Sequence, residues 1–271
     1  MRVGTARHDG GLVPVSVEGE ELRALGASSL LELIESGGTP EATGEVLSGA
    51  RLTAPLIPPK IVAIGLNYMD HVRESGGEPP KNPLVFTKFN SSVIGDGDEI
   101  QLDRSVTERA DWEVELAVVI GKRMRRVPAG EALDYVFGYT VANDVSARDV
   151  QFSDGQWVRG KSLDTFCPLG PVIVTADEIP DPQALPLRTR VNGELVQNSS
   201  TAEMIFSVAE ILSFCSQSFP LNPGDVVLTG TPWGCGEFME PRRSLQDGDV
   251  VEVEVEGIGT LTNACVELPA S

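Results

Sequence analysis

The chain has 271 residues, 41% of them hydrophobic, which is enough to bury a sizeable core in one large domain or in a large domain with a smaller companion. Lys and Arg number 21 against 40 Asp and Glu, so the net charge is −19. A surface that negative repels phosphate backbones and anionic membranes, which argues against nucleic acid and membrane surfaces as partners. An anionic small molecule remains possible wherever a local cation neutralises its site.

The absence of targeting and membrane signals and the pattern of cysteines predict a cytoplasmic protein. No N-terminal basic and apolar signal is visible, and no apolar run approaches the roughly 20 residues of a membrane span. The four cysteines form no CxxC pair and have no histidine at zinc spacing, so we expect buried free thiols in a reducing compartment. They are Cys167, Cys215, Cys235 and Cys265.

Residues 1–55 are expected to form a small N-terminal domain. A strand-like segment at 11–17 precedes two predicted helices, at 28–36 and 40–49. Ser29 is a candidate N-cap of the first helix, which Gly37 and the following Gly38 would end. The proline-rich stretch 52–60 is then a linker or a leading strand into a main domain of residues 56–271.

The main domain is predicted to be mostly β, in an α+β arrangement. Its short strand-like segments are separated by Gly, Pro, Asn and Asp, and Asn192-Gly193 between two of them is a strong hairpin signal. Helical patterns are few, at 67–75 and at 201–218. The predicted strands are 61–66, 84–89, 112–120, 137–144, 171–176, 187–196, 225–230 and 249–268.

The segment DWEVEL, residues 111–116, places two carboxylates on one face of a predicted half-buried strand. With a period of two, Glu113 and Glu115 point to the face opposite Trp112 and Val114, and their Cα atoms lie about 6.5–7 Å apart. Like charges at that spacing repel, so a positive group is expected there. Taken alone, the pair is also compatible with two solvent-facing glutamates.

A third carboxylate, Asp144, follows the predicted strand 137–144. Taken alone, it suits the cap of a helical turn beginning near Ser146. Together with Glu113 and Glu115 it would complete an all-oxygen set that suits Mg²⁺, Mn²⁺ or Ca²⁺ better than zinc.

His71, one of only two histidines, lies on the predicted helix 67–75 with Glu74 three residues later. At that spacing the carboxylate can orient the imidazole and raise its basicity, as a general base requires. A surface pair without a role is the alternative. The stretch 76–83 is rich in Gly and Pro, which would suit a hinged lid.

Several cationic and polar residues could bind an anionic substrate or stabilise an enolate, although singly each is more often a surface group. The backbone around Gly230 and Thr231 could receive a carboxylate or an oxyanion. The side chains in question are Lys88, Arg148, Gln151 and Lys161.

Taken in order, these motifs resemble the fumarylacetoacetate hydrolase superfamily over roughly residues 56–268. The resemblance rests on GLNYMDHVRE, FTKFNSSVIG, DWEVELAVVIG, NDVSARDVQ, GKSLDTFCPLGP, NPGDVVLTGTP and EVEGIGTLTNAC. It implies a mixed β-sandwich roll with a small N-terminal domain, and a homodimer. The segment TPWGCGEFMEPRR departs from the family pattern, because Trp233, Phe238 and Met239 are bulky.

The resemblance also implies roles for the candidate residues. Glu113, Glu115 and Asp144 match the ligands of Mg²⁺, Mn²⁺ or Ca²⁺. The remaining matches are His71 and Glu74 as the catalytic pair on a mobile helix, Lys161 as the enolate-stabilising lysine, Gln151 and Arg148 in the substrate signature, and Thr231 in the loop that holds a substrate carboxylate.

We therefore expect a metal-dependent hydrolase that cleaves a C–C bond in a 2,4-dioxo acid, such as an acylpyruvate or a diketo-deoxy-sugar acid, with a water activated by His71 and Glu74. The same site could instead decarboxylate oxaloacetate or isomerise 2-hydroxyhepta-2,4-diene-1,7-dioate. A protein that binds a 2-oxo acid without catalysis is the alternative from a different class.

Overall fold

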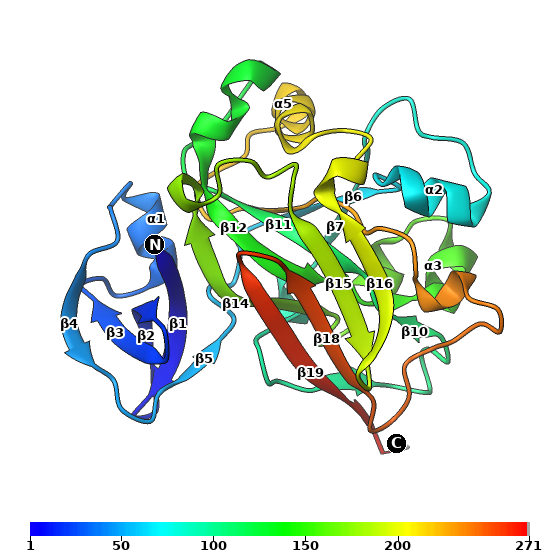
Figure 1. Ribbon diagram of the computed structural model, residues 1–271, viewed down its shortest axis with the longest axis horizontal. Helices are drawn as coiled ribbons and strands as arrows, with labels where there is room; N and C mark the ends of the chain where they lie inside the picture. Colours follow the sequence, from blue (N-terminus) through cyan, green and yellow to red (C-terminus); the bar gives the residue numbers. More distant parts are fainter. Residues whose placement is uncertain (270–271) are drawn as a thin grey trace.

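The computed structural model describes residues 1–269 and confirms the mostly β prediction (Figure 1). Most strands belong to two sheets, one with the order β4-β3-β2-β1-β14-β12-β11-β17-β6-β7 and one with the order β16-β15-β18-β19-β9. None of the helices within residues 1–269 has the length and apolar content that a membrane crossing requires.

The N-terminal part is a small antiparallel sheet with one helix. Its elements are β1 (Arg2–His8), β2 (Gly11–Glu18), β3 (Glu21–Leu25), α1 (Leu30–Glu35), β4 (Ala42–Val46) and β5 (Arg51–Thr53). Ser29 caps α1 as predicted, because its side chain accepts a hydrogen bond from the backbone of Glu32. β1 also pairs with β14 of the main domain, so the small sheet continues into the large one. The division at residue 55 stays a prediction.

The predicted helix at 40–49 is wrong, because residues 42–46 form β4. This strand pairs with β3, and Gly44 lies so close to it that a Cβ there would be 2.7 Å from the carbonyl oxygen of Ala24. Glycine also disfavours a helix interior. The pairing partner therefore decides the conformation of this segment.

The large sheet is completed by strands of the main domain, which pair antiparallel to one another except that β17 runs parallel to β6. These are β6 (Ile61–Gly65), β7 (Leu84–Lys88), β11 (Val114–Ile120), β12 (Val136–Asn143), β14 (Cys167–Thr175) and β17 (Val226–Leu228). The second sheet contains β9 (Ile100–Leu102), β15 (Pro186–Val191), β16 (Glu194–Ser200), β18 (Val250–Val255) and β19 (Gly259–Glu267). The predicted hairpin is confirmed: Asn192 and Gly193, with φ of 53° and 79°, connect β15 to β16.

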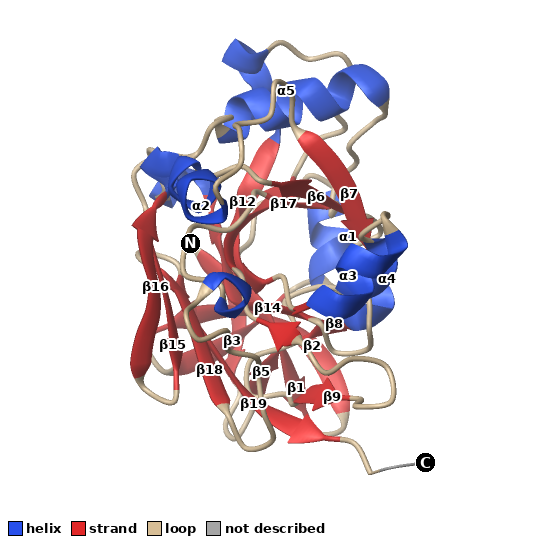
Figure 2. Ribbon diagram, turned by 90° about the vertical axis from the view of Figure 1, so that its right-hand side faces the viewer, coloured by secondary structure: helices blue, strands red, loops and turns tan. Residues whose placement is uncertain are grey.

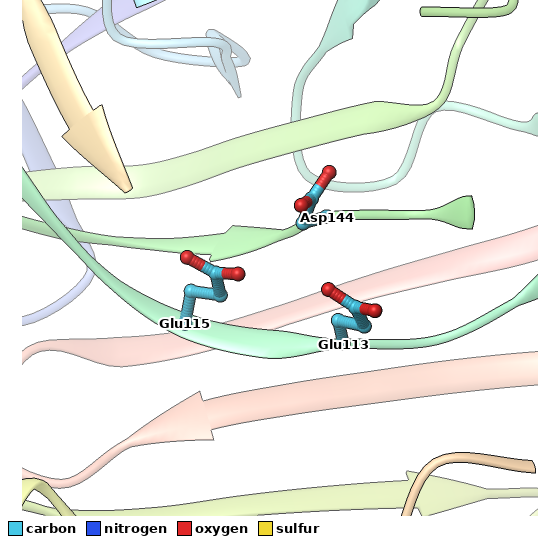
Figure 3. A group of neighbouring side chains, drawn as sticks. All are labelled: Glu113, Glu115 and Asp144. Atoms are coloured by element: carbon cyan, nitrogen blue, oxygen red, sulfur yellow. The ribbon is translucent and has the colours of Figure 1, made fainter. Parts of the chain in front are cut away.

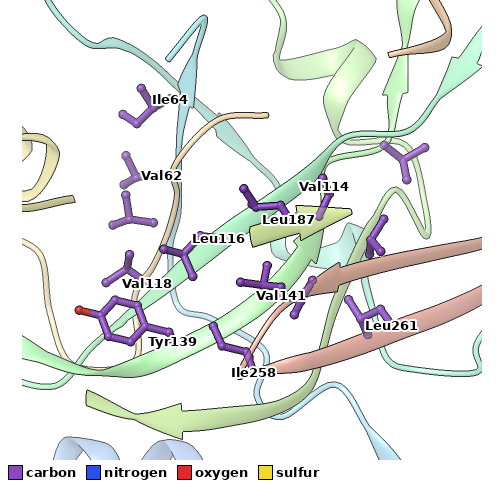
Figure 4. Packing of buried hydrophobic residues seen from close by; sticks show 14 of the residues in the cluster. Val62, Ile64, Val114, Leu116, Val118, Tyr139, Val141, Leu187, Ile258 and Leu261 are labelled. Carbon is purple, nitrogen blue, oxygen red and sulfur yellow. The ribbon is translucent and has the colours of Figure 1, made fainter. Parts of the chain in front are cut away.

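The two sheets pack face to face around one apolar core. Figure 4 shows Val114, Leu116 and Val118 of β11 lying toward Leu187 and Leu261 of the second sheet. The opposite face of β11 is buried as well, so the predicted half-buried strand has no solvent side. Burial of both faces means that any charge on this strand needs a partner inside the protein.

The helices of the main domain lie at the edges of the sheets (Figure 2). They are α2 (Met69–Ser75), α3 (Arg148–Asp154), α4 (Val158–Lys161) and α5 (Val208–Ser218), with short 3₁₀ turns elsewhere. The predicted helix 201–218 is shorter than expected, because Ser207 and Glu210 form a capping box that begins α5 at Val208. Near Ser146 the chain forms the short strand β13 (Ser146–Ala147), which pairs with β10 (Ala110–Asp111), before α3 begins.

Candidate active site

Three carboxylates from two neighbouring strands meet in the interior (Figure 3). Glu115 lies on β11, Glu113 just precedes it, and Asp144 directly follows β12, whose Asn143 pairs with Val114. This register brings Asp144 beside Glu113, and the backbone N–H of Asp144 donates to the carbonyl of Glu113 at 2.9 Å. Carboxylate oxygens of the three side chains lie within 4.8 Å of one another, and all three side chains are buried. Asp144 does not cap a helix.

Buried cations neutralise two of these carboxylates. Lys161 Nζ lies 2.7 Å from Glu113 Oε2 and 2.8 Å from Asp144 Oδ2, and Lys88 Nζ lies 2.6 Å from Asp144 Oδ1. Arg148 Nη1 lies 2.6 Å from Glu113 Oε1. Burial opposes ionisation of Glu113, but the charges of Lys161 and Arg148 outweigh it and lower its pKa to about 2.

Glu115 is the carboxylate that no described cation touches. Its Oε2 accepts a hydrogen bond of 2.7 Å from the backbone N–H of Gly230. Burial, followed by the charges of Asp144 and Glu113, raises the pKa of Glu115 well above its usual range. A divalent cation fits this set, because all the donors are carboxylate oxygens and because a positive charge there would relieve the repulsion on Glu115.

The histidine and its glutamate lie on α2, as expected. His71 Nδ1 is 3.3 Å from Glu74 Oε2, and the carboxylate of Glu74 also accepts from the backbone N–H of Gly234 at 3.0–3.1 Å. The imidazole is only 6% exposed and meets the ring of Phe238 edge to face, with centroids 5.2 Å apart. The imidazole therefore has one orienting carboxylate and one packed aromatic wall.

A small cavity of about 70 Å³ connects the carboxylates to His71. Seven of the predicted site residues line it: His71, Glu113, Glu115, Arg148, Gln151, Lys161 and Thr231. Its apolar walls include Phe86, Phe152, Trp157 and Phe238, of which only Phe238 was singled out from the sequence. The aromatic walls come from distant segments with no common motif, so no local signal identifies them.

Several other residues singled out from the sequence do not line the cavity. Lys88 is only 2% exposed and is used by Asp144, so its position suits holding that carboxylate rather than contacting a substrate. The backbone N–H of Gly230 donates to Glu115, and Gly230 is not among the residues that line the cavity. Trp233, of which 44% is exposed, and Met239 lie outside the lining, so of the three bulky residues Phe238 alone narrows the cavity.

Sequence reasoning missed Asp111, the first residue of DWEVEL. Its buried carboxylate contacts Arg148 Nε at 2.8 Å and accepts three backbone hydrogen bonds, from Trp112 at 2.9 Å, Gly236 at 2.8 Å and Glu237 at 3.1 Å. A signal was present, since a third acid in an apolar strand segment also needs a partner.

Comparison with known proteins places these residues in a family context. Residues 60–266 match the family model described as fumarylacetoacetate (FAA) hydrolase C-terminal. The chain is 48% identical, over 81% of its length and 69% of the relative's, to the mitochondrial oxaloacetate tautomerase fahd2 of Xenopus laevis. It is similar to the solved fumarylacetoacetate hydrolase of Exiguobacterium antarcticum, with 40% identity, a TM-score of 0.91, and coverage of 99% of this chain and 100% of that one. For 2-hydroxyhepta-2,4-diene-1,7-dioate isomerase of Mycobacterium marinum the identity is 40% and the TM-score 0.85, with both chains fully covered.

Proposed function

The chain belongs to the fumarylacetoacetate hydrolase family, and from that premise we propose that it interconverts the keto and enol forms of a small 2-oxo acid such as oxaloacetate. The observation that carries the proposal is that His71, oriented by Glu74, shares one cavity with Glu113, Glu115 and Lys161. That arrangement can move a proton and hold the charge that results. The names of two relatives, a tautomerase and an isomerase, support proton transfer as the reaction class.

Each residue has a defined task in this reaction. A divalent cation held by Glu113, Glu115 and Asp144 would polarise the 2-oxo group and acidify the neighbouring C–H. With Nδ1 of His71 protonated and donating to Glu74, its Nε2 is left as the base that removes this proton. Returning the proton to the oxygen gives the enol, so one C–H bond breaks, one O–H bond forms and the atoms balance.

Lys161 is suited to stabilise the developing negative charge on that oxygen. An ammonium has three N–H donors, and Lys161 donates two of them to Glu113 and Asp144. The third remains for a ligand in the cavity that Lys161 lines. Burial opposes protonation of this lysine, but the charges of Asp144 and Glu113 outweigh it and raise its pKa, so it stays a cation.

The test follows enol absorbance and C3 proton exchange of oxaloacetate in D₂O, with Mg²⁺ or Mn²⁺ added. We expect the protein to accelerate both processes and His71→Asn to lose most of the acceleration. No acceleration of either process by the metal-loaded protein would overturn the proposal.

Hydrolysis of a 2,4-dioxo acid is the second candidate, because a His71 oriented by Glu74 would equally activate a water. Release of acetate and pyruvate from acetylpyruvate, lost in the Glu113→Gln, Glu115→Gln double variant, would support it.

Decarboxylation of oxaloacetate needs no attacking water, so pyruvate formation that survives His71→Ala would favour a lyase. Tight binding without turnover of any 2-oxo acid would instead favour the non-catalytic alternative. The homodimer also stays a prediction.

A further inference from the structure

We propose that Asp111 is a positioning residue that holds the two halves of the candidate site, the carboxylate set and His71, in register with each other. The proposal concerns a residue to which the proposed function assigns no step. Asp111 is 1% exposed and lies at the end of β10, outside the cavity lining. It therefore acts through other residues.

The first connection runs from Asp111 to the carboxylate set. Arg148 donates from Nε to Asp111 Oδ2 at 2.8 Å, and its Nη1 lies 2.6 Å from Glu113 Oε1. The guanidinium is planar and rigid, so fixing it on one carboxylate fixes where it meets the other. Asp111 thereby fixes the position and orientation of the Arg148 guanidinium relative to Glu113.

The second connection runs from Asp111 to His71 through residues 234–238, which we name the 234–238 loop. Backbone N–H groups of Gly236 and Glu237 donate to the two oxygens of Asp111, and the next residue, Phe238, packs edge to face on the His71 ring. The loop also donates from Gly234 to Glu74. One carboxylate thus anchors the segment that touches both members of the His71–Glu74 pair.

The loop is fitted closely to this anchor. A Cβ on Gly236 would lie 2.2 Å from the carbonyl oxygen of Arg243, 2.8 Å from the Trp112 ring and 3.0 Å from Asp111 Oδ1. The shortest of these contacts is with the backbone of Arg243, so only a glycine fits here without displacing the loop that Asp111 anchors. A displacement of the Asp111 carboxylate should therefore move the 234–238 loop, and a displacement of the loop should move the carboxylate.

The test measures both ends in the metal-free and Mn²⁺-titrated full-length protein, without substrate. Asp111→Asn keeps an acceptor oxygen but loses the charge, and it places an NH₂ group among donors. We expect Mn²⁺ affinity to fall about tenfold or more, as for other residues that orient metal ligands. We also expect the His71 imidazole NMR signals to shift, since the Phe238 ring moves. His8, the only other histidine, is the internal reference.

Asp225→Asn is the matched control. Asp225 is also 1% exposed and ion-paired, but its partners Lys60 and Asn222 do not line the cavity. It should lower Tm without changing Mn²⁺ affinity or the His71 signals. If Asp111→Asn does not fold, Gly236→Ala tests the same connection from the loop side, and it should move both readouts.

A folded Asp111→Asn protein in which either readout matches the wild type would overturn the proposal, as would a Gly236→Ala protein with wild-type Mn²⁺ affinity. Because no substrate is used, these results do not depend on whether the protein is a tautomerase. If Asp111→Asn displaces both readouts but the wild-type protein shows no turnover in the separate oxaloacetate assay, only the proposed function is contradicted.

Discussion

Lys161 donates a hydrogen bond of 2.7 Å to Glu113, and both side chains are buried. The same ammonium lies 2.8 Å from Asp144, so one lysine supplies charge to two members of the carboxylate set. The set is therefore partly neutralised before any metal binds, and the lysine and a cation compete electrostatically for the same acids.

Replacing Lys161 by Met should destabilise the metal-free protein and increase its response to Mg²⁺. A buried charge that loses its only partner costs about 3–5 kcal/mol, and the cost here should be smaller because Glu113 keeps Arg148 and Asp144 keeps Lys88. A bound divalent cation restores the lost positive charge, so the Mg²⁺-induced rise in Tm should exceed that of the wild type. Thermal unfolding with and without Mg²⁺ checks this, with Lys122→Met at an exposed position as control. An equal or smaller rise would contradict the expectation.

Glu115→Gln should strongly weaken metal binding without destabilising the metal-free fold. The pKa of Glu115 is raised by burial and by Asp144 and Glu113, so the folded protein already favours its neutral form. A neutral amide of similar shape can still accept the hydrogen bond from Gly230. We expect Mn²⁺ affinity to fall about 100-fold or more by titration, with Tm in chelator equal to or above wild type. Glu131→Gln, at an exposed site, should change neither value.

Metal affinity and stability should both depend on pH through Glu115. The raised pKa means that the folded, metal-free chain holds a proton that the unfolded chain releases near pH 4.5. This contribution to stability is complete below pH 4.5 and is lost as the pH rises through the raised pKa. Mn²⁺ must displace the same proton, so its affinity should increase with pH over that window. Titrations between pH 5 and pH 8 check this, and a flat profile would contradict it.

The contribution of Glu113 to stability should depend on pH in the opposite direction to that of Glu115. Its pKa of about 2 lies below its ordinary value of 4.5, so its contribution to stability is present above pH 4.5 and is lost as the pH falls toward 2. Unfolding monitored between pH 5 and pH 2 should show this acid loss in the wild type. Glu113→Gln should show less of it.

His71→Asn should separate catalysis from metal binding. His71 lines the cavity and belongs to the pair with Glu74 rather than to the carboxylate set. Loss of a general base lowers turnover by about 10²–10⁴-fold, whereas Mn²⁺ affinity should stay within about twofold of wild type. Steady-state rates together with Mn²⁺ titration test this, and His8→Asn is the matched control. Turnover that survives the substitution would mean that another group moves the proton.

The strand and turn patterns of the sequence predicted most of the secondary structure of the main domain. Alternation through Val114, Leu116 and Val118, and the Asn192-Gly193 turn, predicted elements that the structure contains, because these signals depend on neighbours along the chain. The segment 42–46 was misread as a helix, since its conformation is decided by β3 and by close approach at Gly44. Its local sequence does not encode that contact.

The candidate site divides in the same way. The residue types of Glu113, Glu115, Asp144 and the His71–Glu74 pair, at their spacings, already indicated metal and proton chemistry in the sequence. The tertiary structure decided which cations these acids meet. It placed Lys88 beside Asp144 and directed the N–H of Gly230 to Glu115, and within residues 1–269 it gives Glu115 no positive partner. It also brought Asp111 into contact with Arg148 on the side of the carboxylate set and with Gly236 on the side of His71. Hydrogen bonds between residues 37 to 125 positions apart arise only when the strands pack, so no local pattern could have revealed them.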